Sequence, residues 1–152
     1  MAMTMKGAVA LPADRETVWA KLNDPEVLKA CIPGCQTLEK TSETSFTAVV
    51  KLKVGPVGAT FKGNVELTDL DPPNGYRISG QGEGGVAGFA KGGATVSLTD
   101  PAEGAEGCTL NYDVEANVGG KIAQLGARLI DGVAKKTADQ FFANFAAAVK
   151  AG

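Results

Sequence analysis

The sequence contains no histidine among its 152 residues. Histidine is the side chain that most readily exchanges protons near neutral pH, and it is the commonest metal ligand. Its absence excludes Ser-His-Asp and Cys-His catalytic arrangements, and also zinc or iron sites that depend on imidazole. Paired acidic residues at a fixed spacing are lacking too, so we expect no catalytic residues and no metal site.

Cysteine is scarce, with only Cys31, Cys35 and Cys108. An odd number does not build a disulfide framework, and three is fewer than the four ligands of a structural zinc ion or an iron–sulfur cluster. A free cysteine is usually a small buried apolar residue; the alternative for Cys31, which precedes a break in the chain, is a reactive thiol. Few cysteines are typical of a reducing compartment.

Long apolar runs and a strong charge of one sign are also missing. The longest apolar run, residues 141–149, contains Asn144 and is shorter than the roughly 18 residues of a membrane helix. The first residues do not form the charged and then apolar leader of a signal peptide. A net charge of −2 offers no basic field to nucleic acid. We therefore expect a cytoplasmic protein with no nucleic-acid partner.

The length and the apolar content describe an ordinary globular chain. At 44% hydrophobic residues and near the roughly 150 residues of an average domain, residues 1–152 are expected to form one domain. Alternation of apolar and polar residues over 3–11 predicts a half-buried strand. Asp14 then precedes a short helix over 15–22, and Asp24 with Pro25 precedes a second over 26–30.

Segments of period 2 recur after these helices. They predict a hairpin over residues 46–67 with its turn at Gly55-Pro56, and further strands around 76–78, 94–98 and 110–118. The total is six or seven antiparallel strands. After Gly119-Gly120 the apolar residues recur at helical spacing, which predicts one helix over residues 121–149. Its single apolar stripe needs a broad partner, and the inner face of the sheet is the one available.

Glycine is concentrated in residues 80–93. Residues 80–85 match the spacing G-x-G-x-x-G, but a dinucleotide loop needs a helix directly after it, and a strand-like segment follows here. We interpret these glycines as places where the sheet bends or another group approaches its backbone closely. The alternative is a flexible rim at the mouth of a pocket.

Three parts of the sequence, taken in order, resemble the family of carbon monoxide dehydrogenase G subunits. They are VWAKLNDPEVL (18–28) with CIPGC (31–35), VGPV (54–57) with FKG (61–63), and VGGKIAQLGARLID (118–131). That family belongs to the larger group of polyketide-cyclase and START-related (SRPBCC) domains. The resemblance implies an α+β helix-grip (START/Bet v 1-like) fold. In it a curved antiparallel sheet of six to seven strands wraps around a long C-terminal helix, with two short helices after the first strand.

The resemblance also implies an elongated apolar cavity between sheet and helix. Members are encoded alongside molybdenum-containing carbon monoxide dehydrogenases and related hydroxylases, are thought to help attach them to the membrane, and do not themselves carry out catalysis. We therefore expect a non-catalytic module without a cofactor that binds an apolar small molecule, a lipid or a quinone. It would assist the membrane attachment or electron transfer of such an enzyme, peripherally at the inner face of the membrane.

The candidate ligand-binding residues lie on the inward phase of the strands and on the inner stripe of the helix, with residues 86–89 as the gate. They are Val50, Leu52, Val54, Phe61, Val65, Val86, Phe89, Leu125, Leu129 and Val133.

Two alternatives stay open. A cyclase or hydrolase of the wider superfamily would need polar groups inside the cavity, from Tyr112, Arg77 or Glu83, although the alternation places Arg77 and Glu83 outward. A recruitment domain without a ligand would use an exposed surface, for which the candidates are Lys51, Lys53 and Lys62.

Overall fold

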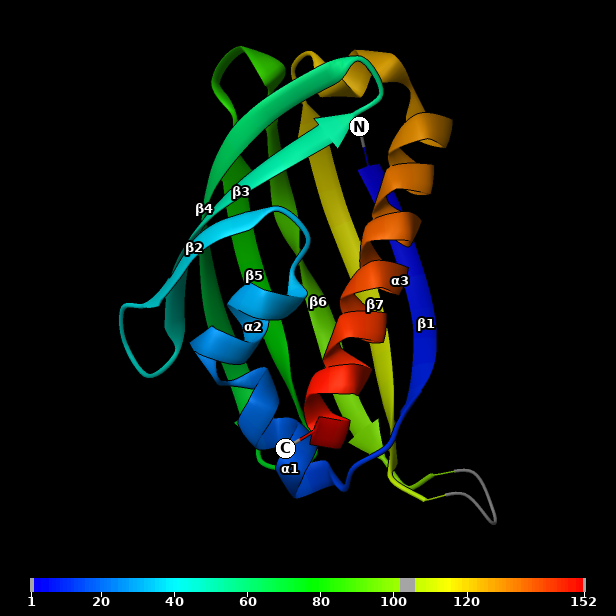
Figure 1. Ribbon diagram of the computed structural model, residues 1–152. Helices are drawn as coiled ribbons and strands as arrows, with labels where there is room; N and C mark the ends of the chain where they lie inside the picture. Colours follow the sequence, from blue (N-terminus) through cyan, green and yellow to red (C-terminus); the bar gives the residue numbers. More distant parts are fainter. Residues whose placement is uncertain (1, 102–105, 152) are drawn as a thin grey trace.

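The computed structural model describes residues 2–101 and 106–151 (Figure 1). Strand β1 (Ala2–Leu11) leads into helices α1 (Arg15–Leu22) and α2 (Pro25–Cys31). The strands that follow are β2 (Cys35–Lys40), β3 (Ser45–Val54), β4 (Val57–Asp71), β5 (Gly75–Glu83), β6 (Phe89–Thr99) and β7 (Cys108–Gly119). Short 3-10 turns, η1 (Gly85–Ala87) and η2 (Ile122–Leu125), precede β6 and the C-terminal helix α3 (Ala127–Ala151).

All strands of the described residues join one antiparallel sheet, in the order β1-β7-β6-β5-β4-β3-β2. Strands β2 to β7 are neighbours in chain order, and β1 pairs with β7 from Ala2 opposite Asn117 to Leu11 opposite Cys108. Helix α3 lies across the inner face of the curved sheet, with α1 and α2 near its C-terminal end (Figure 1). The predicted helix-grip architecture is confirmed.

The short helices begin where the sequence predicts. The carboxylate of Asp14 accepts a hydrogen bond of 2.8 Å from the backbone N–H of Thr17, and Asp24 caps α2 in the same way through Glu26. Each cap satisfies a backbone donor that has no partner within its helix. Asn144 of α3 donates a hydrogen bond to the carbonyl oxygen of Cys31, which fastens α2 to the long helix.

The structure differs from the predictions in two elements. Strand β2 was not predicted, because Cys35–Lys40 has few apolar residues; it is an edge strand whose residues are half-buried or exposed. The C-terminal helix begins at Ala127, six residues later than predicted. Gly126 has φ +95, a left-handed backbone conformation that a continuous α-helix does not contain, so residues 122–125 form a separate 3-10 turn.

The glycine-rich segment folds as the β5–β6 hairpin. Gly85 and Gly88 flank its turn with positive φ, and no α-helix follows residues 80–85, which excludes the dinucleotide-loop arrangement. A Cβ atom at Gly92 would collide with the carbonyl oxygen of Glu115 on the neighbouring strand. Close backbone approach therefore accounts for this glycine.

Candidate ligand-binding site

Apolar side chains fill the two ends of the space between the sheet and α3. The first set, here the C-terminal cluster, includes Phe145, Leu110 and Val18, all almost fully buried. Its rings pack tightly, with Trp19 edge-on to Tyr76 at 5.2 Å and Phe142 stacked on Tyr112 at 5.2 Å between centroids. The second set, here the hairpin-end cluster, is built around Val54, Ala87, Val118, Ile122 and Ile130.

A strip of apolar residues between these clusters is only half-buried. Ala94 lies opposite Val114, and Val114 opposite Met5, so the three share the inner face of the sheet. Ala48 and Val50 occupy the inner face of β3 between Phe46 of the C-terminal cluster and Leu52 of the hairpin-end cluster. None of the five strip residues belongs to either core cluster, and each is half-buried on the inner face of the sheet. The inner strip therefore lies between the two packed clusters without belonging to either.

The chemistry of the inner strip is apolar. Gly63 lies opposite Ala48 and Gly92 opposite Ala116, which keeps the floor of the sheet free of bulky side chains. Among the described residues, the buried side chains that carry a polar atom are those of Tyr76, Cys31 and Cys108, and no charged residue is buried. Tyr112 is the polar side chain that faces inward closest to the strip, and its ring is held against Phe142. Such a lining binds apolar molecules by removing their surface from water, and few polar groups are available to orient them.

The predicted ligand-binding residues are distributed unevenly over this interior. Val50 lies on the inner strip, and Val65 packs against the C-terminal cluster. The largest group belongs to the hairpin-end cluster and comprises Leu52, Val54, Phe61, Leu125 and Val133.

Three of the predicted residues lie on the surface instead. Val86 is 93% exposed on η1. Phe89 was expected to face inward, but it lies opposite Glu83 and Gly119 on the outer face, where its ring covers Gly119, and it is 47% exposed. Leu129, on the first turn of α3, is 36% exposed and reaches the β3–β4 turn. A Cβ atom added at Gly55, in that turn, would lie 2.7 Å from Cδ2 of Leu129.

Sequence reasoning missed Met5, Ala48, Ala94 and Val114. All four occupy the inward phase of strands that the alternation had identified, so the signal was present. The sequence pattern favoured the large apolar residues of the β3–β4 hairpin over the alanines of the strip and over the strands at the other side of the sheet. Residue size is a poor guide here, because a ligand occupies the space that small residues leave.

The polar residues considered for catalysis do not converge in the interior. Arg77 pairs with Glu115 and donates a hydrogen bond of 3.2 Å to Thr95 on the outer face, as its strand phase predicts. Glu83 is exposed on the same face, opposite Lys62. Burial raises the pKa of Tyr76 far above its ordinary range, so this phenol stays protonated. Within residues 2–101 and 106–151 no group of acidic or cysteine side chains could hold a metal ion.

Two shallow grooves of about 600 Å³ each lie mainly over the outer face. One is lined by Arg77, Lys91 and Glu115 and the other by Thr37, Lys62 and Glu83, and both include Thr47 and Asn64. Most of these side chains are polar, and Arg77 of the first groove pairs with Glu115. Neither groove reaches Met5, Val50, Ala94 or Val114 of the inner strip.

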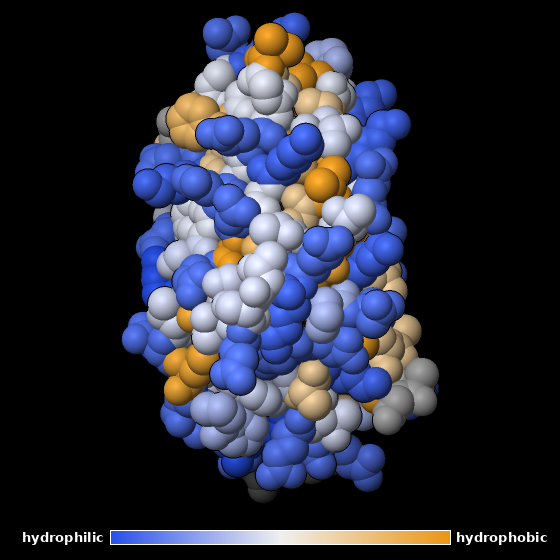
Figure 2. All heavy atoms as spheres, turned by 90° about the vertical axis from the view of Figure 1, so that its left-hand side faces the viewer, coloured by the Kyte–Doolittle hydropathy of each residue, from blue (hydrophilic) through white to orange (hydrophobic). Residues whose placement is uncertain are grey.

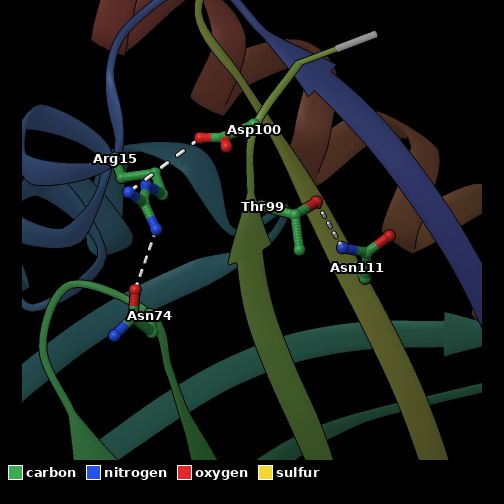
Figure 3. A network of polar contacts seen from close by, with 5 residues as sticks. All are labelled: Arg15, Asn74, Thr99, Asp100 and Asn111. Atoms are coloured by element: carbon green, nitrogen blue, oxygen red, sulfur yellow. Dashed lines mark hydrogen bonds and ion pairs between the residues drawn. The ribbon is translucent and has the colours of Figure 1, made fainter.

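The end of the molecule opposite the β3–β4 turn is held by a polar network (Figure 3). Arg15 of α1 donates a hydrogen bond of 2.9 Å to Asn74 in the β4–β5 turn and lies 3.9 Å from Asp100 at the end of β6. Asn111 of β7 bonds Thr99 at 3.1 Å. These contacts tie α1 to the strand ends at this end of the molecule.

Comparisons with known proteins agree with this architecture. The sequence model of a family described as the G subunit of carbon monoxide dehydrogenase (CoxG) matches residues 7–150. The solved structure of a conserved protein from Geobacillus kaustophilus is 33% identical, with a TM-score of 0.87 over 97% of this chain and 95% of that chain. No curated protein matches the chain significantly.

More distant solved structures share the fold alone. An aromatase/cyclase from Streptomyces sp. R1128 has a TM-score of 0.66 at 11% identity, over 99% of this chain and 94% of that chain. Ara h 8.0201 has a TM-score of 0.67 at 15% identity, over the full length of both chains. Because the family match covers almost the whole chain and the helix-grip architecture agrees with it, the protein belongs to the CoxG family, the G subunits of carbon monoxide dehydrogenase.

Proposed function

We propose that the protein is a non-catalytic carrier of an elongated apolar molecule, a lipid or a quinone, which lies along the inner strip between the sheet and α3. The observation that carries this proposal is the half-buried state of Met5, Val50, Ala94 and Val114 on the inner face. Apolar side chains in an interior are ordinarily covered by neighbouring side chains, because burial of apolar surface stabilises the fold by about 25 cal/mol per Å². A ligand would supply the missing contact.

Membership of the CoxG family supports a proposal about the enzyme that the protein serves. We propose that the carrier serves a carbon monoxide dehydrogenase or a related molybdenum hydroxylase, whose membrane attachment or electron transfer it assists. A quinone suits this role because it accepts electrons and is itself apolar. Affinity purification of the tagged chain from cells that produce such an enzyme tests the association, and its failure to retain the enzyme above an untagged control would contradict it.

The proposal places the entry of the ligand at the hairpin end, where Leu129 of α3 contacts the β3–β4 turn at Gly55 and η1 carries the exposed Val86. Residues 86–89 remain the proposed gate, and entry would require the Leu129–Gly55 contact to part. Because Leu129 is exposed, it is a rim residue in this proposal, and a substitution meant to fill the interior belongs on the inner strip.

The test compares two variants, each with one alanine replaced by tryptophan. Ligand uptake is measured by native mass spectrometry followed by organic extraction. Ala94→Trp places an indole on the inner strip, whereas Ala8→Trp makes the same change on the outer face of β1, where Ala8 is exposed. We expect the wild type and Ala8→Trp to take up one lipid or quinone per chain. Ala94→Trp should bind at least about tenfold more weakly, a loss of about 1.4 kcal/mol.

Circular dichroism establishes that both variants are folded, and Val50→Phe is the milder substitution if Ala94→Trp unfolds. A wild type that takes up neither ligand class would contradict the carrier function. Equal uptake by all variants would contradict the inner strip as the site. If the wild type takes up neither lipid nor quinone, the alternative of a recruitment domain without a ligand would stand. Charge reversal of Lys51, Lys53 and Lys62 would be its test.

A further inference from the structure

The hairpin end exposes apolar side chains that the interior does not use. Val86 is 93% exposed, Phe89 47% and Leu129 36%, and Pro56 is exposed at the β3–β4 turn. Figure 2 shows hydrophobic atoms gathered at the top of the molecule, the end at which the β3–β4 turn lies in Figure 1. Large aliphatic side chains this exposed are a cost to a protein that meets only water.

These residues belong to turns that lie side by side. Leu129 reaches Gly55 of the β3–β4 turn, and the backbone of Gly120 lies against Gly88, at the end of the β5–β6 turn. The turns and the start of α3 therefore form one surface, here called the hairpin tip and defined as residues 53–56, 85–91 and 120–129.

Cations surround the hairpin tip. Lys53, Lys91, Lys121 and Arg128 are all exposed, and none forms an ion pair with another described residue. The acidic residues beside the tip are Glu83 and Asp131. The opposite end of the molecule carries more acidic than basic residues, with Asp14, Glu16, Asp24, Asp69, Asp71 and Asp100 against Arg15, Lys21 and Lys150. This polarity orients the tip toward a negatively charged surface and turns the other end away from it.

We infer that the hairpin tip docks on an anionic lipid bilayer. Apolar side chains on projecting turns enter the headgroup region, while a collar of unpaired cations is attracted to anionic lipids, and the two terms add. Val86 projects from a turn and lines no groove, which suits insertion into a fluid interface better than seating on another protein. The inference rests on the membrane attachment in the proposed function, for which it names the contacting surface, and it holds whether or not the interior carries a ligand.

The experiment is flotation of the whole chain with vesicles of phosphatidylglycerol and phosphatidylcholine, and with vesicles of phosphatidylcholine alone. The wild type should float with the anionic vesicles, and added salt should release it. Val86→Asp should abolish flotation. Lys121→Gln and Arg128→Gln should each weaken it about fivefold, since one basic residue near an anionic surface contributes about 1 kcal/mol.

Matched controls lie away from the tip. Leu70→Asp changes another exposed apolar residue, 41% exposed on β4, and Lys29→Gln removes a cation from α2. Both should float like the wild type. The proposal is overturned if the wild type stays with the soluble fraction, if it floats equally with uncharged vesicles, or if the controls lose as much binding as the tip variants. Loss of ligand uptake without loss of flotation would contradict the carrier function alone.

Discussion

Strand phase separates residues of the same kind into interior and surface positions. Val50 and Phe89 are both apolar and both lie in strands, yet Val50 faces α3 and Phe89 faces outward. The alternation of β6 places Ala90, Gly92 and Ala94 on the inner face. Phe89 is one residue out of phase with them and therefore faces outward. The outward position of Phe89 is what makes it available to the hairpin tip.

The cysteines make a first prediction at this scale. Burial raises the pKa of all three thiols, and Cys31 and Cys108 are 2% and 1% exposed. The thiol form reacts slowly with alkylating agents, because the thiolate is the nucleophile. Under native conditions iodoacetamide should modify the half-buried Cys35 first, and the other two only on unfolding. Mass spectrometry of peptides gives the order, and early modification of Cys31 would instead support a reactive thiol.

Glu66 predicts a pH dependence of stability. Its carboxylate accepts hydrogen bonds from the hydroxyls of Ser45 and Thr44, which lower its pKa. A group whose pKa is lower in the folded state stabilises the protein above its unfolded pKa of about 4.3, and this contribution disappears as the pH falls through the lowered value. Glu66→Gln should therefore lose stability at neutral pH and converge with the wild type in acid. Urea unfolding at several pH values measures this; a constant difference would contradict it.

At the scale of elements, the C-terminal helix shows that apolar periodicity alone does not locate the first residue of a helix. Ile122 and Leu125 continue the apolar spacing of α3, so the pattern joins residues 121–149 into one helix. The left-handed conformation of Gly126 divides them. Apolar periodicity reports which residues are buried, and a 3-10 turn beside a helix can bury the same residues. The break turns residues 122–125 into part of the hairpin end.

Two glycines in this region predict opposite effects of the same substitution. Gly126→Ala places a side chain at φ +95 and should destabilise the protein by about 1 kcal/mol or more. Gly132→Ala lies inside α3, where an added Cβ meets nothing within 4 Å, and should stabilise it by about 0.5–1 kcal/mol. Chemical denaturation compares the pair. Stabilisation by Gly126→Ala would show that a continuous helix is accessible.

At the scale of the whole molecule, most of the fold could be predicted from sequence. Alternation gave β1 and the β3–β4 hairpin, and caps gave α1 and α2, because these signals are local. The edge strand β2 has no such signal, since its few apolar residues bury little. The inner strip was predicted only through Val50, because the boundaries of the two packed clusters depend on how distant elements pack together.

The two ends of the molecule differ in packing, charge and chemistry. Phe145 is fully buried in the C-terminal cluster, and Arg15 ties the strand ends beside it. The hairpin end carries exposed apolar residues and unpaired cations instead. No helix within the described residues is long and apolar enough to cross a membrane. Under the proposed function, contact with a bilayer through the hairpin tip would bring the proposed ligand entry to the phase in which apolar ligands are stored.

The most direct measurement of the central claim is methyl NMR of the protein with a spin-labelled stearate. A nitroxide carried into the space between the sheet and α3 broadens the methyl groups around it. The account predicts broadening of Met5, Val50, Ala94 and Val114 before Leu70 and Ala8, with loss of the effect when unlabelled quinone competes. Broadening confined to Val86 and Leu129, or spread evenly over the surface, would contradict a ligand-binding interior.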